Sequence, residues 1–181
     1  MDKMIGTKEL LELVNEKNLV ENLCDRELQN PEGAGFDLRV GEVFIIEGGE
    51  AFLGEFERHT PKAGSIARYK EKKDIILKPG DFVLVKTIEK VNLPEDIAAI
   101  FRPRSTLQRC GIGLFTATAS PGYSGELTFG MCNLGQNDFR LELGARFIHI
   151  IFFKTTDNVS EYRGQWQGGR VSTDGEKEFQ V

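Results

Sequence analysis

The sequence predicts a mainly β fold of antiparallel strands with one helix at the N-terminus. Short apolar or alternating segments follow one another as hairpins, and no alternation of helices with strands indicates a parallel sheet. The chain contains 20 glycines and 13 phenylalanines, which indicates many turns around a β-rich core. Only near the start do apolar residues recur with the spacing of a helix.

Length and charge restrict the possible functions. The 181 residues suit one domain, spanning residues 1–181, with a core of useful size. The chain is 40% hydrophobic and 28% charged, which is ordinary for a globular protein. A net charge of −5 argues against a nucleic acid polymer or an anionic membrane surface as the partner. A small anionic ligand is still compatible with this net charge, because its binding depends on the arginines near the site.

The cysteines and the N-terminus indicate a reduced, cytoplasmic protein. No apolar run approaches the roughly 18 residues that span a bilayer, and the first residues lack the pattern of a signal peptide. Cys24, Cys110 and Cys132 are odd in number and widely spaced. This spacing excludes a zinc deaminase of the His-x-Glu and Cys-x-x-Cys type and favours free thiols.

The first half of the chain predicts the helix and a polar-faced strand. The helix is expected at residues 7–23, with Thr7 able to cap its start. At residues 33–44, apolar residues alternate with Asp37 and Arg39, which predicts a strand with one polar face. A long polar connection follows at residues 47–73, with short strands at 51–56 and 64–69 and a solvated His59.

The second half predicts a series of strands interrupted by one helical turn. His149 is expected to be a packed, hydrogen-bonded residue in an apolar strand. The expected strands are residues 74–77, 82–87, 97–101, 139–142 and 147–153, with a helical turn at 104–111 and a β-arm at 113–119.

Residues 101–135 carry the clearest functional pattern. Three arginines, at 102, 104 and 109, surround Ser105 and Thr106. Guanidinium groups match the geometry of phosphate oxygens, and the first N–H groups of a helical turn add to an anion site. The turn at residues 121–125 ends on a tyrosine, Tyr123, whose exposed ring offers a face to a sugar or base. The alternative is an ordinary surface loop with solvated arginines.

Several motifs, in this order, resemble those of the dCTP deaminase / dUTPase family. The resemblance covers roughly residues 30–171. It implies a distorted antiparallel β-barrel or jelly-roll-like β-clip, a homotrimer with active sites between subunits, and a pyrimidine deoxynucleoside triphosphate as ligand. The matching segments are Gly35-x-Asp37-Leu38-Arg39-x-Gly41, Pro103-Arg104-Ser105-Thr106-Leu107, Arg109, Thr116-Ala117, Pro121-Gly122-Tyr123-x-Gly125 and Asn133.

The resemblance also assigns roles to residues. It implies a catalytic set of Asp37, Ser105, Arg109 and Ser120, in which Asp37 holds Mg²⁺ or its waters and Ser120 bonds the sugar 3′-hydroxyl. Arg104, Ser105 and Thr106 would hold the phosphates, and Tyr123 would stack on the deoxyribose. The remaining nucleotide-binding positions are Thr116 and Ala117, whose backbone reads the pyrimidine, together with Pro121, Trp166, Gln167 and Arg170.

The C-terminal segment, residues 159–181, is glycine-rich, aromatic and basic near its start. It resembles the segment that folds over the nucleotide in deaminases, where Trp166 would cover the ligand and Arg170 would reach a phosphate. The alternative is a disordered tail.

Four positions depart from the family pattern, and two of them lie in the C-terminal segment, where Gln165 replaces a usual lysine and Gly169 a usual glutamine. Ser120 stands where dUTPases carry an aspartate, and Gly130 stands where dCTP deaminases carry a glutamate. Glu126 is four residues earlier on the same strand, about 13 Å away, so it cannot replace that glutamate. The main hypothesis is Mg²⁺-dependent hydrolysis of dUTP or a related dNTP to monophosphate and pyrophosphate. The alternatives are dCTP deamination to dUTP or dUMP, and a dNTP-binding regulator without turnover.

Overall fold

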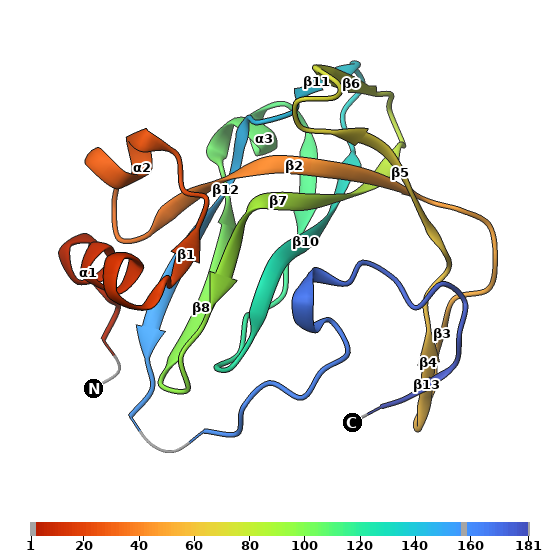
Figure 1. The fold of residues 1–181 in the computed structure, drawn as a ribbon. Coiled ribbons are helices and arrows are strands. Elements are labelled where there is room, and N and C mark those ends of the chain that lie inside the picture. Colours follow the sequence, from red (N-terminus) through yellow and green to blue (C-terminus); the bar gives the residue numbers. More distant parts are fainter. Residues whose placement is uncertain (1–2, 157–158, 181) are drawn as a thin grey trace.

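The computed structural model describes residues 3–156 and 159–180 and is built around an antiparallel, barrel-like sheet (Figure 1). Its strands follow the order β8-β12-β2-β7-β10-β9, with β1 added to β7 and β5 added to β2. The mainly β prediction is therefore confirmed. The strands of this sheet are β1 (Val20–Glu21), β2 (Phe36–Ile46), β5 (Ala63–Arg68), β7 (Phe82–Asn92), β8 (Ile97–Pro103), β9 (Ile112–Phe115), β10 (Ser124–Asn133) and β12 (Arg146–Lys154).

Two smaller sheets extend the barrel. A two-stranded sheet pairs β6 (Asp74–Leu77) with β11 (Phe139–Glu142). A three-stranded sheet joins β3 (Phe52–Leu53), β4 (Glu57–His59) and the C-terminal β13 (Glu178–Phe179). In this sheet His59 is only 7% exposed and stacks on the ring of Phe52, so the prediction of a solvated histidine was wrong.

The helices are short. Helix α1 (Thr7–Lys17) ends six residues before the predicted boundary, because Asn18 adopts a left-handed conformation (φ 52°) and Val20–Glu21 pairs with β7. The first turn has Gly6 as its N-cap, and Thr7 makes no capping bond. Helix α2 (Asp25–Gln29) was not predicted, whereas α3 (Ser105–Arg109) lies inside the predicted turn. Within the described residues, no helix is both long and apolar enough to cross a membrane.

Strand β2 is buried on both faces, which corrects the prediction of a polar face. Asp37 and Glu42 are 4% and 8% exposed. The strand lies between β12 and β7, and its two buried carboxylates are paired with cationic side chains, Glu42 with Lys86 and Asp37 with Arg146. Burial of a charge is tolerated only with such partners.

Edge-to-face contacts between aromatic rings stabilise the interior of the barrel. Phe129 makes edge-to-face contacts with Phe101 and Phe147, at centroid distances of 5.0 and 5.8 Å. Burying one such side chain contributes about 1.5–3 kcal/mol. Leu107 of α3 is buried in the same core and so fixes the helix that begins at Ser105.

The C-terminal segment folds back along the barrel instead of leaving it (Figure 1). The N–H of Tyr162 donates to the carbonyl of Pro121 at 2.7 Å, and a short 3₁₀ helix, η1 (Gln167–Gly169), packs on β10. Farther on, Thr60 and Thr173 exchange hydrogen bonds, and β13 pairs with β4. Two separate attachments therefore tie this segment to the barrel.

Candidate functional site

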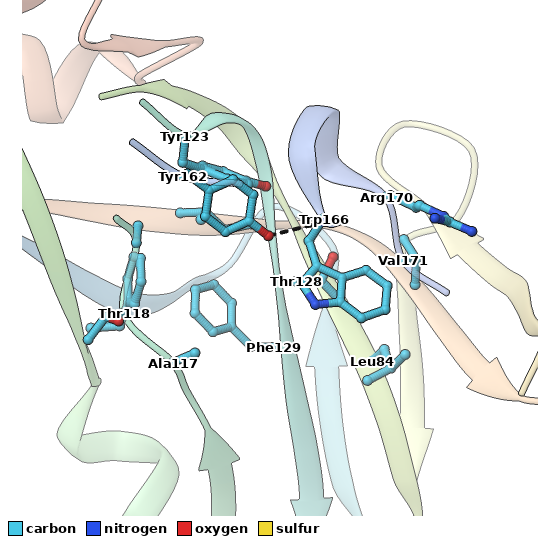
Figure 2. Close-up of a pocket in the computed structure, with 13 residues that line it drawn as sticks. Leu84, Ala117, Thr118, Tyr123, Thr128, Phe129, Tyr162, Trp166, Arg170 and Val171 are labelled. Atoms are coloured by element: carbon cyan, nitrogen blue, oxygen red, sulfur yellow. Dashed lines mark hydrogen bonds between the residues drawn. The ribbon is translucent and has the colours of Figure 1, made fainter. Parts of the chain in front are cut away.

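A cavity of about 410 Å³ opens where the C-terminal segment crosses β10 (Figure 2). Its walls come from the barrel, from the segment between β9 and β10, and from the C-terminal segment. The lining residues are Leu84, Phe101, Ala117, Thr118, Ala119, Tyr123, Leu127, Thr128, Phe129, Tyr162, Trp166, Arg170 and Val171.

One wall of the cavity is a strand edge. Strand β9 pairs with β10 only from Gly130 to Asn133, because it ends at Phe115. The predicted β-arm is thus shorter than expected, and among the described residues its chain rejoins the sheet through a single bridge between Ala119 and Ala99. Residues 127–129 of β10 lie beside this gap. Backbone N–H and C=O groups at such an edge suit recognition of a planar polar ring.

Tyr123 lines the cavity, but it is not the exposed platform that the sequence predicted. The side chain is 7% exposed and packs edge-to-face against Tyr162, with ring centroids 5.2 Å apart. Its hydroxyl donates to the carbonyl of Glu126 at 2.6 Å. Burial, helped by Tyr162 and Glu126, raises the pKa of Tyr123 to about 12. The phenol therefore stays neutral and holds the turn at residues 121–125 against the C-terminal segment.

The C-terminal segment closes the cavity from the other side (Figure 2). Trp166 lines it, and the backbone N–H of Trp166 donates to the hydroxyl of Tyr162 at 3.1 Å. Gln167 accepts from the N–H of Ser124 at 3.1 Å and donates to the carbonyl of Gly122 at 3.0 Å. These contacts fasten the segment to the turn that the sequence analysis singled out.

Arg170 lies at the cavity but is not free. Its Nε donates to the carbonyl of Ser172 at 2.8 Å, and its Nη1 pairs with Glu178 at 2.5 Å. A phosphate would have to compete with Glu178 for this guanidinium. The predicted phosphate contact therefore requires a rearrangement of the pair.

The predicted arginine and hydroxyl cluster lies apart from the cavity. Within the described chain, neither Arg104 nor any residue of α3 lines it. Ser105, Thr106 and Arg109 are exposed, and Arg109 donates to the carbonyl of Ser105 at 3.2 Å. A single chain thus has two separate candidate binding features: the cavity, and the exposed, positively charged start of α3.

Asp37 belongs to a buried charge network rather than to an open floor. One carboxylate oxygen accepts from Arg104 and from Nη1 of Arg146, the latter at 3.0 Å, and the other oxygen lies 2.9 Å from Nδ1 of His149. Glu27 of α2 is 1% exposed and accepts the N–H of Asp37 at 3.0 Å. The expectation that His149 is packed and hydrogen-bonded is met.

The electrostatics of this network favour a neutral histidine. Burial lowers the pKa of His149, and Arg104 acts in the same direction, while Glu27 opposes both. A neutral His149 can donate from Nδ1 to Asp37 and complete the network.

These residues do not fit a magnesium ion. Mg²⁺ needs free oxygen ligands, and both oxygens of Asp37 face cationic or N–H donors. The described residues also contain no cluster of three carboxylate, histidine or cysteine groups that could hold a metal. The predicted metal role of Asp37 gains no support from this arrangement. Instead, the carboxylate holds Arg104 at the start of α3.

Ser120 and Gly130, where the resemblance predicts acids, have well-defined surroundings in the structure. Ser120 lies in the turn, where its carbonyl accepts the N–H of Tyr123 at 3.2 Å. Gly130 lies under two aromatic rings: a Cβ atom added there would come within 2.9 Å of Phe82 and 3.3 Å of Phe115. Glu126 packs against Gly169 of the C-terminal segment, not against Gly130. Apolar rings therefore fill the space beside the glycine.

Of the other predicted contacts, only Ala117 lies at the cavity. Thr116 and Pro121 do not line it. Sequence reasoning missed Glu27 and Arg146, which hold Asp37, and the cavity residues Leu84 and Thr128. No local motif marks them, because strand pairing and the unpredicted α2 bring them to these sites.

Comparisons with known proteins agree with this geometry. The family model described as "dCTP deaminase-like" matches residues 4–155. The chain is 33% identical to a dCTP deaminase of Pyrobaculum calidifontis, over 77% of this chain and 78% of that protein. It is 32% identical to a dCTP deaminase, dUMP-forming, of Dictyoglomus turgidum, over 84% of this chain and 81% of the relative.

Solved structures support the fold. The 2′-deoxycytidine 5′-triphosphate deaminase of Agrobacterium tumefaciens matches with a TM-score of 0.66 at 16% identity, covering 84% of this chain. The match spans only 49% of that deaminase's chain, about half its length. A dUTPase of phage phi11 of S. aureus, described with a structural Mg(II) ion, matches with a TM-score of 0.50 at 14% identity, over 81% of this chain and 94% of the dUTPase. The protein belongs to the dCTP deaminase-like family.

Proposed function

We propose that this protein binds a pyrimidine deoxynucleoside triphosphate in the cavity and hydrolyses dUTP, or a related dNTP, to the monophosphate and pyrophosphate. The observation that carries the proposal is a cavity of about 410 Å³ beside an open strand edge, capped by Trp166 and Tyr162. This volume lies within the roughly 300–1,000 Å³ of small-molecule sites. Aromatic rings and backbone polar groups are the partners that a nucleoside needs.

We propose a homotrimer because the residues expected to hold the phosphates lie outside the cavity of their own chain. Ser105, Thr106 and Arg109 are exposed and lie outside the cavity of their own chain. If the start of α3 from one subunit meets the cavity of the next, Arg104 and Ser105 reach the phosphates of a nucleotide held by the neighbour. Asp37 then acts as the positioning residue of Arg104, and Arg170 adds a further cation after it leaves Glu178.

Hydrolysis is favoured over deamination by the cavity chemistry. Among the described residues, those that line the cavity include neither a carboxylate nor a histidine. Deamination needs proton transfers at the pyrimidine ring, whereas cleavage of a phosphoanhydride depends mainly on positioning and charge stabilisation. Ser120 is a poor base near neutral pH, so we expect slow turnover. Because Asp37 does not fit Mg²⁺, the reaction should be assayed with and without the metal.

Two other functions are candidates, and one observation supports each of them. The relatives named dCTP deaminase favour deamination of dCTP to dUTP or dUMP. The replacement of both expected acids, by Ser120 and Gly130, favours a dNTP-binding regulator without turnover.

A direct test uses the single tryptophan. Titration of Trp166 fluorescence with dUTP, dCTP, dTTP and purine dNTPs reports binding, and chromatography of overnight reactions reports products. Trp166→Phe should abolish the optical signal, and Trp166→Ala should weaken binding. Monophosphate and pyrophosphate from one pyrimidine support the proposal. A deaminated product supports the second candidate, binding without product supports the third, and an absence of binding overturns all three.

The trimer has its own test by complementation. Arg104→Ala and Trp166→Ala should each lose activity, and Arg140→Ala is the matched control because its side chain is exposed and lies 3.8 Å from Asp74. When the two inactive chains are co-expressed and mix at random, about a quarter of the sites should be active. These are the sites that take an intact Arg104 from one subunit and an intact Trp166 from its neighbour. No regain from mixed oligomers would mean that both residues act within one subunit.

A further inference from the structure

The polar chemistry of the cavity points to one residue that neither motifs nor relatives single out. Thr128 lies on β10 and lines the cavity (Figure 2). Its hydroxyl oxygen is buried and has no hydrogen-bond partner among the described residues. Buried polar groups are almost always bonded, so such an orphan needs an explanation. The cavity beside it offers one.

A bulge in the pairing of β10 with β7 lies next to Thr128 and affects the direction of its side chain. Strand β10 pairs Glu126 with Lys90 and Thr128 with Lys86, so three residues of β7 face one residue of β10. Such bulges re-aim side chains and are common beside active sites. The side chain of Thr128 therefore owes its direction to a break in the sheet.

Thr87 holds that break. It is 3% exposed, accepts the N–H of Leu127 at 3.0 Å through its hydroxyl, and donates to the carbonyl of Glu89 at 2.6 Å. On the other side of β7, Gly41 is an extra residue of β2, and a Cβ there would lie 2.7 Å from the Thr87 carbonyl. The central strand is thus distorted on both sides at Thr87, and a side-chain hydroxyl replaces the lost ladder bond.

We infer that Thr128 is a specificity-determining residue whose hydroxyl bonds the pyrimidine base of the bound nucleotide, and that Thr87 is its positioning residue. This inference rests on the proposed nucleotide site. Rotation about the Cα–Cβ bond of Thr128 exchanges its methyl and hydroxyl groups and turns the oxygen toward the cavity. The base is the expected contact because Leu127 and Phe129, on either side, form the open strand edge.

The test is Thr128→Val, which removes the hydroxyl and keeps the shape. Without nucleotide, the variant should unfold at the same temperature as the wild type or higher, since an unpaired buried hydroxyl is lost. With nucleotide, affinity for the preferred pyrimidine should fall about 3- to 10-fold, and the preference among dUTP, dCTP and dTTP should shrink by a similar factor. Thr128→Ser should restore both.

Thr87 is tested separately. Thr87→Val should lower the melting temperature and reduce the same base preference, and Thr87→Ser should restore both. Thr173→Val is the matched control, because it removes another buried threonine hydroxyl, one bonded to Thr60. If Thr87→Val does not fold, hydrogen exchange of the Leu127 amide in the wild type replaces it, and nucleotide should slow that exchange.

The outcomes separate the two proposals. If the wild type binds no dNTP, the proposed function fails. If the wild type binds and discriminates, but Thr128→Val keeps the same preference, the inference is wrong. An equal loss of affinity for all three pyrimidines also overturns it, because the contact would then be with the sugar. Unchanged exchange of the Leu127 amide contradicts the role of Thr87.

Discussion

Asp37→Asn distinguishes an anchor for Arg104 from a metal ligand. The substitution removes a buried negative charge and keeps the size of the side chain. Arg104 then loses its counter-charge, whereas Arg146 keeps Glu27 at 3.6 Å, and the two arginine side chains are 31% and 29% exposed. Because solvent partly screens them, the loss is below the roughly 3–5 kcal/mol of a fully buried pair. We expect about 2–3 kcal/mol, from charge-assisted bonds of about 1.5–3 kcal/mol each.

The assay is thermal unfolding in the presence of a chelator, followed by nucleotide titration. For a chain of this size, each kcal/mol shifts the melting temperature by about 2–4 °C, so the expected fall is about 4–12 °C. Affinity for the triphosphate should fall as well, while affinity for the nucleoside should hold, since the proposed site gives Arg104 contacts to the phosphates alone. Arg104→Ala should show the same split between triphosphate and nucleoside.

A metal-ligand role predicts the opposite pattern. Removing a carboxylate that serves only to hold Mg²⁺ should leave the chelated protein as stable as before, or more stable. It should also abolish any stabilisation that the wild type gains from Mg²⁺. An unchanged melting temperature in chelator would therefore refute the anchoring role of Asp37.

Three further predictions concern separate parts of the site. Because burial lowers the pKa of His149, folding stability should be lost as pH falls below its ordinary value of about 6.5, and His149→Gln should flatten melting temperature between pH 7 and 5.5. A melting temperature that falls equally in both proteins would contradict this. Gly130→Glu should cost about 1–3 kcal/mol by crowding Phe82, and the added Phe82→Ala should recover part of it in denaturant titrations. Equal, additive losses would refute the crowding. If Gly130→Glu still forms no deaminated product, the missing glutamate was not the only defect. Gln167→Ala should loosen the C-terminal segment, so Trp166 emission should shift to the red and iodide quenching should rise, with little change in melting temperature. An unchanged spectrum would mean that the segment is held elsewhere.

Much of the fold could be predicted because strands leave a local signature. Alternation and turns gave the expected antiparallel strands, and β6 and β11 have the predicted bounds. The end of α1 could not be read in the same way. Residues 19–23 continue an apolar pattern, but the pairing of Val20 with Val91 is a long-range contact, and it takes the chain out of the helix.

The site was harder to predict because its geometry depends on partners far apart in the sequence. Asp37 was singled out by motif, yet its surroundings come from α2, β12 and the start of α3. Tyr123 was expected to be exposed because its turn is short and polar, and Tyr162 covers it from 39 positions later. Whether such residues meet a ligand or each other is decided by tertiary packing.

Gly130 shows how the residue at one position and the packing around it are linked. Phe82 and Phe115 lean over the glycine with ring centroids 6.1 Å apart, and both rings are partly exposed. A carboxyl group placed between them would be desolvated, which raises a carboxyl pKa and disfavours the anion. The rings and an ionised glutamate therefore compete for one place. A chain that keeps these phenylalanines offers an apolar wall to a pyrimidine ring, and we expect Gly130→Glu alone not to supply a general base. Combining Gly130→Glu with Phe82→Ala therefore separates the steric crowding from the chemistry of the added carboxyl group.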